Sequence, residues 1–373
     1  MPVAEIVGGG IAGFVTSILL ARRGWSVRVH ERSHQLRASG NGITIFENGL
    51  RVLEALDLAP DVVAYGQNMK RWDILRHTAE LIVSHDPVAA TGGRVVMFQR
   101  QALIDLLAKA ARSAGVEIAL GSQVVGADTQ GVVTIQDGSQ LKADLVVGAD
   151  GIFSPVRRSI VGDLPLGNHR KGAIRTLIPI EAEEFPEGDL SIGREYNHPS
   201  GRRVGLLPCS STVCYLILVS LRTDEAAHTT PIEPELWTSS FPSLSRFFKR
   251  VGALGHYDPY FSVSVPKWHY GRCALVGDAA HGMTPALGQG AGCAMMTAYA
   301  LGSADFDNKA LGDALEDWET GIRPLISFTQ KFAEDMTEGR LDPNNEVFFA
   351  DPKLRPVLEA DIPARFRQEP AFL

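Results

Sequence analysis

Several features that would assign the sequence to particular protein classes are missing. Its four cysteines show neither C-x-x-C spacing nor a nearby histidine pattern. We therefore expect no disulfide framework and no metal site, and we expect these cysteines to pack inside the protein. No uncharged run reaches the roughly 18 residues that a membrane-spanning helix needs, and no basic segment precedes an apolar stretch at the N-terminus. These absences predict a cytoplasmic protein without a membrane partner.

An excess of positive charge is also missing. The formal net charge is −7 over 373 residues, so no overall basic field attracts nucleic acid. The apolar fraction of 45% and the charged fraction of 21% are typical of a globular enzyme. The chain is long enough for two hydrophobic cores. We expect a monomer or homodimer that does not bind nucleic acid.

A glycine-rich loop is the most informative feature near the N-terminus. Gly8, Gly10 and Gly13 match G-x-G-x-x-G, between the apolar residues 3–7 and a helical pattern over residues 12–23. The first glycine permits a tight turn, the second lets the backbone approach a pyrophosphate, and the third allows close helix packing. Glu31 follows roughly 20 residues later, where a carboxylate accepts ribose hydroxyls. This unit predicts bound FAD or NAD, and the alternative is a glycine-rich turn without a ligand.

Two further aspartate motifs follow in the chain. The first is the turn 148–151, which contains Asp150, and the second spans residues 277–290 and begins with Gly-Asp-Ala-Ala-His. Asp278 ends an apolar strand pattern, where its carboxylate can accept hydrogen bonds from ribityl hydroxyls. The helix that begins near Gly288, Gln289 and Gly290 would direct its N–H groups and positive end toward the flavin N1–C2=O edge, which stabilises reduced flavin. The alternative for each motif is a strand-to-helix turn with a capping aspartate.

In this order, the three motifs resemble those of class A flavoprotein aromatic hydroxylases, the family of p-hydroxybenzoate and salicylate hydroxylases. The resemblance implies FAD as the cofactor, with NAD(P)H and O2 as cosubstrates, and a role in aromatic-compound catabolism. It implies FAD contacts at Arg37 and Arg100, and a position for Pro285 beside the isoalloxazine. It assigns Asp150 to flavin and nicotinamide binding together. The implied reaction is hydroxylation of an electron-rich ring by a flavin C4a-hydroperoxide.

Within this family, the chain most resembles the oxygenases of pyridine carboxylates, although the likeness is weakest in the middle of the sequence. This implies substrate contacts for Tyr215, which is also a candidate catalytic residue for proton transfer. It implies carboxylate contacts for Arg203 and Arg175, whose planar forks suit both carboxylate oxygens. Sheet packing of the tyrosine and solvent exposure of the arginines are the alternatives. The expected substrate is a carboxylated phenolic or N-heteroaromatic ring. The sequence does not decide whether the ring opens after oxygenation.

Other functions on the same fold remain alternatives. One is a flavin-dependent reductase or dehydrogenase that acts on an alkene, and another is an FAD-binding protein without turnover. A flavin-dependent halogenase is not expected, because the sequence has no W-x-W-x-I-P run. The preference between NADH and NADPH is not readable, because Glu31 would contact the ribose of the bound FAD.

The pattern of elements predicts an α/β fold. It consists of a doubly wound, Rossmann-like FAD-binding domain, an inserted antiparallel β-sheet substrate domain, and C-terminal helices. The antiparallel sheet is expected because consecutive strands follow one another without intervening helices, at residues 173–180, 190–196, 203–208 and 213–221. The FAD-binding domain is expected to comprise residues 1–72, 96–166 and 268–335. The substrate domain is expected at 73–95 and 167–267, with a C-terminal tail over 336–373. Residues 263–276 are expected to form a strand, and Pro324 to kink or bound a helix over 310–333.

Overall fold

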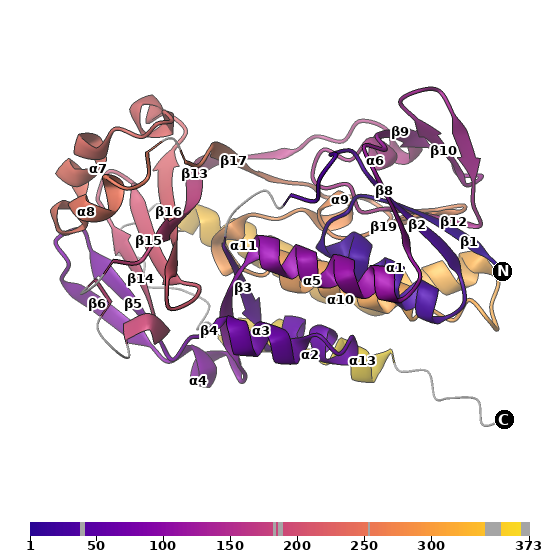
Figure 1. The fold of residues 1–373 in the computed structure, drawn as a ribbon, viewed down its shortest axis with the longest axis horizontal. Helices are drawn as coiled ribbons and strands as arrows, with labels where there is room; N and C mark the ends of the chain where they lie inside the picture. The colour runs from indigo at the N-terminus through magenta and orange to yellow at the C-terminus, as the bar shows by residue number, and fades with distance from the viewer. Residues whose placement is uncertain (38–41, 182–183, 186–188, 253, 340–351, 367–373) are drawn as a thin grey trace.

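Two β-sheets of different kind lie at opposite ends of the molecule (Figure 1). The computed structural model describes residues 1–37, 42–181, 184–185, 189–252, 254–339 and 352–366. The first sheet has the order β18-β19-β12-β1-β2-β8. Its strands are β1 (Val3–Val7), β2 (Ser26–Glu31), β8 (Glu117–Leu120), β12 (Leu145–Gly148), β18 (His269–Tyr270) and β19 (Cys273–Leu275). All pairs except β18 with β19 are parallel.

The parallel sheet carries the glycine loop at the carboxyl end of strand β1. Its central strand β1 pairs with β2 on one side and with β12 on the other, so the direction of winding changes at β1, and ligands bind at the carboxyl ends of strands beside such a switch point. Helix α1 (Ile11–Arg22) leaves this end of β1 and packs against α10 (Gly290–Gly302) and α5 (Arg100–Ser113). Ile6, Phe14 and Val15 are fully buried between these layers.

The second sheet carries a core on one face. Its order is β17-β13-β16-β15-β14-β5-β6. The strands are β5 (Arg71–Arg76), β6 (Leu81–His85), β13 (Gly167–Pro179), β14 (Ile192–Asn197), β15 (Arg203–Pro208), β16 (Val213–Leu221) and β17 (Tyr257–Ser262). Val204 and Leu206 of β15 pack with Trp237 and Phe247 from the outer helices α7 (Pro234–Ser240) and α8 (Ser245–Phe248). Because side chains alternate along a strand, the intervening residues of β15 face the half of the molecule that contains the parallel sheet.

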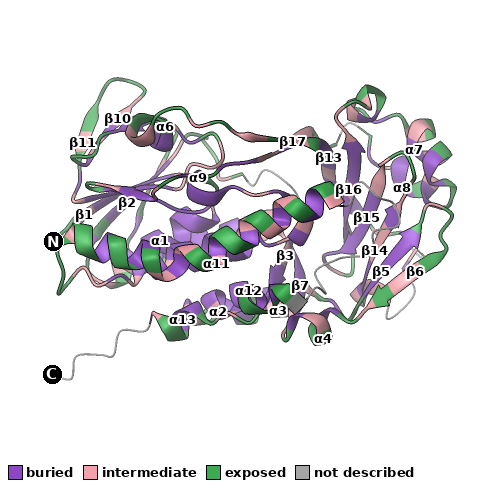
Figure 2. Cartoon of the chain, turned by 180° about the vertical axis from the view of Figure 1, so that it is seen from behind, coloured by how far each residue is buried: buried purple, intermediate pink, exposed green. Residues whose placement is uncertain are grey.

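A smaller sheet and a long helix connect the two halves. The smaller sheet has the order β3-β7-β4, formed by β3 (Gly42–Phe46), β4 (Gln67–Asn68) and β7 (Val95–Gln99). Helix α11 (Leu311–Gly339) runs along the back of the molecule, with one face buried and the other exposed (Figure 2). The remaining small sheet consists of β9 (Val124–Ala127), β10 (Val132–Ile135) and β11 (Gln140–Lys142).

The predicted fold class is confirmed, and one local prediction is wrong. Over residues 263–276, only β18 and β19 are strands, and they are joined by a turn at Gly271, whose φ is +58°. Helix α11 continues past Pro324, so the helix does not end there, and the alternative of a kink at Pro324 stays a prediction. We propose the predicted division into an FAD-binding and a substrate domain for this chain, since β5 and β6 pair with the strands after residue 166. None of the described helices is long and apolar enough to cross a bilayer.

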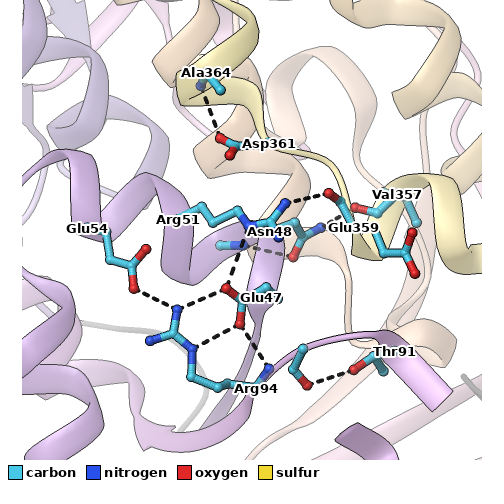
Figure 3. Close-up of polar contacts among 12 residues, drawn as sticks. Glu47, Asn48, Arg51, Glu54, Thr91, Arg94, Val357, Glu359, Asp361 and Ala364 are labelled. Carbon is cyan, nitrogen blue, oxygen red and sulfur yellow. Dashed lines mark hydrogen bonds and ion pairs between the residues drawn. The ribbon is translucent and has the colours of Figure 1, made fainter. Parts of the chain in front are cut away.

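Ionic and polar contacts around α2 (Glu47–Ala55) hold the C-terminal helices in place (Figure 3). Both Glu47 carboxylate oxygens accept hydrogen bonds from the Arg94 guanidinium at 2.9 Å. Asn48 donates to the Val357 carbonyl at 3.1 Å, and Arg51 donates to the Glu359 carbonyl at 2.5 Å. Burial alone would raise the pKa of Glu47, but its bonds to Arg94 outweigh burial and lower it. The paired carboxylate therefore stabilises the fold when it is ionised.

We expect Glu47→Gln to lower the free energy of unfolding by about 1–3 kcal/mol at pH 7. A lowered pKa in the folded state gives stability that is present above the unfolded value of 4.5 and lost as the pH falls through the folded value. In urea unfolding, the difference in the free energy of unfolding between wild type and variant should therefore become smaller below pH 4.5. Asp335→Asn, in the exposed pair with Lys331, is the control and should change little. A gap independent of pH would contradict this account.

Candidate active site

The glycine loop has the geometry that a dinucleotide needs. Gly8 has a φ of +111°, and a Cβ atom there would lie 2.3 Å from the Ala149 carbonyl oxygen. A Cβ atom on Gly13 would lie 2.0 Å from the Gly8 carbonyl oxygen. These two glycines are therefore required by the close approach of backbone to backbone. Gly10 differs, because no atom lies within 4 Å of its Cβ position, which leaves open space for a pyrophosphate.

Glu31 is fixed beside this loop. Its carboxylate accepts hydrogen bonds from the Gly9 amide at 3.1 Å and from the Ser33 amide at 2.9 Å. The carboxylate is half-buried at the carboxyl end of β2, the position predicted for a ribose contact. Arg37 lies further along the same segment, is exposed, and donates to Gln35 at 3.1 Å. Residues 38–41, which directly follow Arg37, lie outside the described residues, and the FAD contact of Arg37 stays a prediction.

Asp278 and Arg100, which follow strands β19 and β7, interact electrostatically. Asp278 is the first residue of α9 (Asp278–His281), and it is exposed although it lies deep among protein atoms. Burial raises the pKa of Asp278, while the charges of Arg100 and Arg175 act in the opposite direction. Burial lowers the pKa of Arg100, which Asp278 counteracts. A deep carboxylate with an open surface suits the hydroxyls of a ribityl chain.

Asp150 has a structural contact at the turn where the resemblance implies a cofactor contact. Its carboxylate accepts a hydrogen bond from the Val156 amide at 3.1 Å, at the start of α6 (Pro155–Val161). Burial raises the pKa of Asp150. Arg157 of the same helix is buried and donates to the Ala279 carbonyl at 2.9 Å. This bond holds the second predicted motif against the third, and the cofactor contact of Asp150 stays a prediction.

The segment from Pro285 to Gly290 leads into helix α10. Gly288 has a φ of +65°, which ends the short helix η4 (Pro285–Leu287), and α10 begins at Gly290. No atom lies within 4 Å of the Cβ position of Gly290, so the N-terminal end of α10 is accessible to a ligand. The Gln289 side chain is buried and accepts a hydrogen bond from Asn48 at 2.9 Å. Its side chain therefore links α10 to α2, which leaves its backbone for the predicted flavin contact.

A cavity lies between this segment and the inner face of the seven-stranded sheet. Tyr215, Arg175 and Arg203 line it together with Pro285–Gly288, so the predicted substrate residues and Pro285 are brought into one site. Tyr215 is 7% exposed, and its ring packs on Gly42, where a Cβ atom would lie 2.3 Å from it. Burial raises the pKa of Tyr215 to about 12, although Arg175 and Arg100 act in the opposite direction. The phenol therefore keeps its proton at neutral pH and can donate a hydrogen bond.

The two arginines have different surroundings. Arg203 donates to the Asn197 side chain at 2.9 Å, and its guanidinium lies 3.5 Å from the Glu195 carboxylate. Both members of this ion pair are largely buried, so much of the charge of Arg203 is compensated. The Arg175 guanidinium lies 6.0 Å from the centre of the Tyr260 ring and interacts electrostatically with Tyr215. Arg175 therefore brings positive charge to the tyrosine at the cavity wall.

Sequence reasoning missed several residues of the cavity wall. Trp72, Glu195, Gly205 and Leu207 all line the cavity, but none belongs to a motif. The available signal was the alternation of β14 and β15, which puts Glu195, Gly205 and Leu207 on the same face as Arg203. The pairing of these strands, with Glu195 opposite Gly205, had to be known before the alternation could be applied to a site.

We expect Gly10→Ala to weaken FAD binding by at least about tenfold without lowering the stability of the apoprotein. The new methyl group meets no protein atom, but it would occupy the space that lets a pyrophosphate approach the backbone. The measurements are the FAD dissociation constant by fluorescence and the melting temperature of the apoprotein. Gly312→Ala, also without atoms within 4 Å, is the control in α11 and should leave FAD affinity unchanged. Unchanged affinity in Gly10→Ala would place the pyrophosphate elsewhere.

Comparisons with known proteins agree with this geometry. The family model described as FAD binding domain matches residues 1–304. A putative 2-heptyl-3-hydroxy-4(1H)-quinolone synthase of Rhodococcus erythropolis is 38% identical over 335 residues, which cover 88% of this chain and 86% of that protein. A 2-heptyl-3-hydroxy-4(1H)-quinolone synthase of Mycobacteroides abscessus is 34% identical, with 88% of each chain covered.

A solved structure extends the similarity to the whole fold. The crystal structure of a variant of 2-methyl-3-hydroxypyridine-5-carboxylic acid oxygenase superposes with a TM-score of 0.91 at 34% sequence identity, covering 99% of this chain and 100% of that one. The resemblance to class A aromatic hydroxylases that the three motifs predicted is thereby confirmed, as is FAD as the cofactor. The chain belongs to the FAD binding domain family and is a flavin-dependent monooxygenase of the class A aromatic hydroxylase type.

Proposed function

We propose that the protein uses NADH or NADPH and O2 to hydroxylate an N-heteroaromatic ring that carries an alkyl substituent. The observation that carries this proposal is the single cavity that joins Pro285–Gly288 to Tyr215 and Arg175. Pro285–Gly288 form one wall of this cavity, directly before the start of α10, where we place the FAD. Tyr215 and Arg175 face the same space from the opposite wall. A ring held between them would meet the reactive edge of the cofactor away from bulk water.

The choice of ring follows from the similar proteins. Two of them are named for a product with a heptyl group at C2 and a hydroxyl at C3 of a quinolone. The solved oxygenase is named for a pyridine with a methyl group at C2 and a hydroxyl at C3. These rings share a nitrogen, an adjacent alkyl group and a neighbouring oxygen substituent. We therefore assign a 2-alkyl N-heteroaromatic ring to this chain as its substrate class.

The charges of the cavity support a ring with an oxygen that carries negative charge. Lys171, Arg175 and Arg203 are cationic and Glu195 is anionic among the described residues that line the cavity. The surplus positive charge favours an ionised ring hydroxyl or oxo group, and it also suits a ring carboxylate. A carboxylated ring is the second candidate, although the pairing of Arg203 with Glu195 removes part of the charge that would bind it.

The residues of this chain have defined roles in the proposed reaction. Bound FAD supplies hydride acceptance from NAD(P)H and the activation of O2. The protonated Tyr215 donates a hydrogen bond to the ring oxygen, and Arg175 stabilises negative charge that develops there. Leu207 and Ile217 form apolar walls of the cavity, which exclude water and orient the ring. Asp278 and Arg100 contact the bound FAD.

The proposed reaction is tested by NADH and NADPH oxidation with the yellow holoenzyme, 2-alkylquinolones and hydroxylated pyridine carboxylates, and by the mass of each product. The proposal predicts that 2-alkyl rings accelerate the oxidation and that the product gains one oxygen atom. A gain of two oxygen atoms would indicate ring opening in addition. Oxidation that no ring accelerates, with no oxygen in any product, would exclude the proposed reaction and favour the reductase alternative.

We expect Tyr215→Phe to lower kcat/KM for the ring substrate by about 10- to 100-fold, because one hydrogen bond to a charged group is lost. The FAD content should not change. The pKa of Tyr215 is about 12, so this phenol should not lose its proton between pH 6 and 10. The dependence of kcat/KM on pH should therefore have the same shape in wild type and variant over this range. Tyr257→Phe is the matched control, since Tyr257 stacks on His228 away from the cavity. Equal losses in both variants would remove the specific role of Tyr215.

A further inference from the structure

We propose that Gly205 determines the length of the ring substituent that the enzyme accepts, and that its missing side chain leaves space for an aliphatic chain. This inference rests on the proposed function and goes further, because it assigns substrate selection to a single backbone position. Gly205 is buried in β15 and lines the cavity. No sequence motif includes it.

The fold does not require a glycine at this position. The φ angle of Gly205 is not in the left-handed region, and an added Cβ atom would come no closer than 3.4 Å to any atom, the nearest being Ile217. Gly193 on the neighbouring strand shows the contrast, since a Cβ there would lie 2.8 Å from Trp72. Glycine in the interior of a strand weakens it and often marks the close approach of a ligand. The space above Gly205 therefore belongs to the cavity.

The register of the strands places Gly205 one step away from the ring site. Leu207 pairs with Tyr215, Gly205 pairs with Ile217, and Glu195 is opposite Gly205 on the other side. Residues on the same face of a strand are about 7 Å apart. A methyl substituent on a ring beside Tyr215 would not reach Gly205, whereas a chain of several carbons would.

The surroundings of Gly205 select the chemistry of the substituent. Ile217 and Leu207 adjoin it on the cavity face. Glu195, on the neighbouring strand β14, forms an ion pair with Arg203. An unbranched alkyl chain would bury its methylene groups against Ile217 and Leu207. Each buried methylene should raise the affinity by about fourfold. A side chain at position 205 would fill this space and leave the ring site beside Tyr215 open.

The experiment compares wild-type, Gly205→Ala and Gly205→Leu holoenzymes with 2-alkyl-4-quinolones from methyl to nonyl. Dissociation constants come from the change in flavin absorbance on titration, and kcat/KM from NAD(P)H oxidation. The proposal predicts that wild-type affinity rises with chain length. It predicts that Gly205→Leu loses at least about tenfold in affinity for the heptyl compound and less than about threefold for the methyl compound. The affinity of Gly205→Ala for the heptyl compound should lie between those of the wild type and Gly205→Leu. Gly312→Leu in α11 should have the affinity of the wild type.

The outcomes separate this inference from the proposed function. An equal loss for methyl and heptyl compounds in Gly205→Leu, with FAD content intact, would overturn the role of Gly205 while hydroxylation stands. Affinity that depends on chain length and is changed by the substitution would support the role of Gly205. If no product then contains added oxygen, the proposed reaction would be excluded while the role of Gly205 stands. If Gly205→Leu does not fold, Gly205→Ala decides, because its Cβ atom fits the wall without displacing an atom. Affinity of that variant equal to wild type for the longest chains would overturn the proposal.

Discussion

The close contact between the turn at Gly8–Gly13 and the end of β12 is the constraint on which the rest of the structure depends. Gly8 touches Ala149 and Gly13 touches Gly8 so closely that neither could carry a side chain. This contact sets where α1 begins, and therefore where its unpaired N–H groups point. The same packing brings α10 against α1, so the start of α10 and Pro285 lie at a fixed place relative to the dinucleotide site.

A chain of electrostatic interactions connects the predicted cofactor residues to the predicted substrate residues. Asp278 interacts with Arg100, Arg100 with Tyr215, and Tyr215 with Arg175. Each group is deep in the protein, where charges interact more strongly than in water. The tyrosine at the centre stays protonated because burial outweighs the effect of both arginines. The electrostatics around Tyr215 therefore depend on Asp278 and Arg100, although these two residues begin helices α9 and α5 while Tyr215 lies in strand β16.

The sequence was most informative where a residue type is required by local geometry. The glycine loop, Glu31 and the 277–290 segment were predicted because close backbone approaches and strand ends demand particular residues at short spacing. The β15 and β16 strands were predicted with the bounds that the structure has. Gly205 and Glu195 could not be predicted, because their role depends on which strands pair. The compensation of Arg203 by Glu195 was missed for the same reason, as it joins neighbouring strands.

The central claim is that the cavity at Tyr215 is where a ring accepts one oxygen atom from O2. The most direct test is turnover of a 2-alkyl-4-quinolone by the purified holoenzyme under oxygen gas enriched in the heavy isotope, followed by mass spectrometry of the product. The account predicts one labelled oxygen atom on the ring for each NAD(P)H consumed in coupled turnover. A product whose new oxygen comes from water, or NAD(P)H oxidation that yields only reduced oxygen with every ring tested, would contradict it.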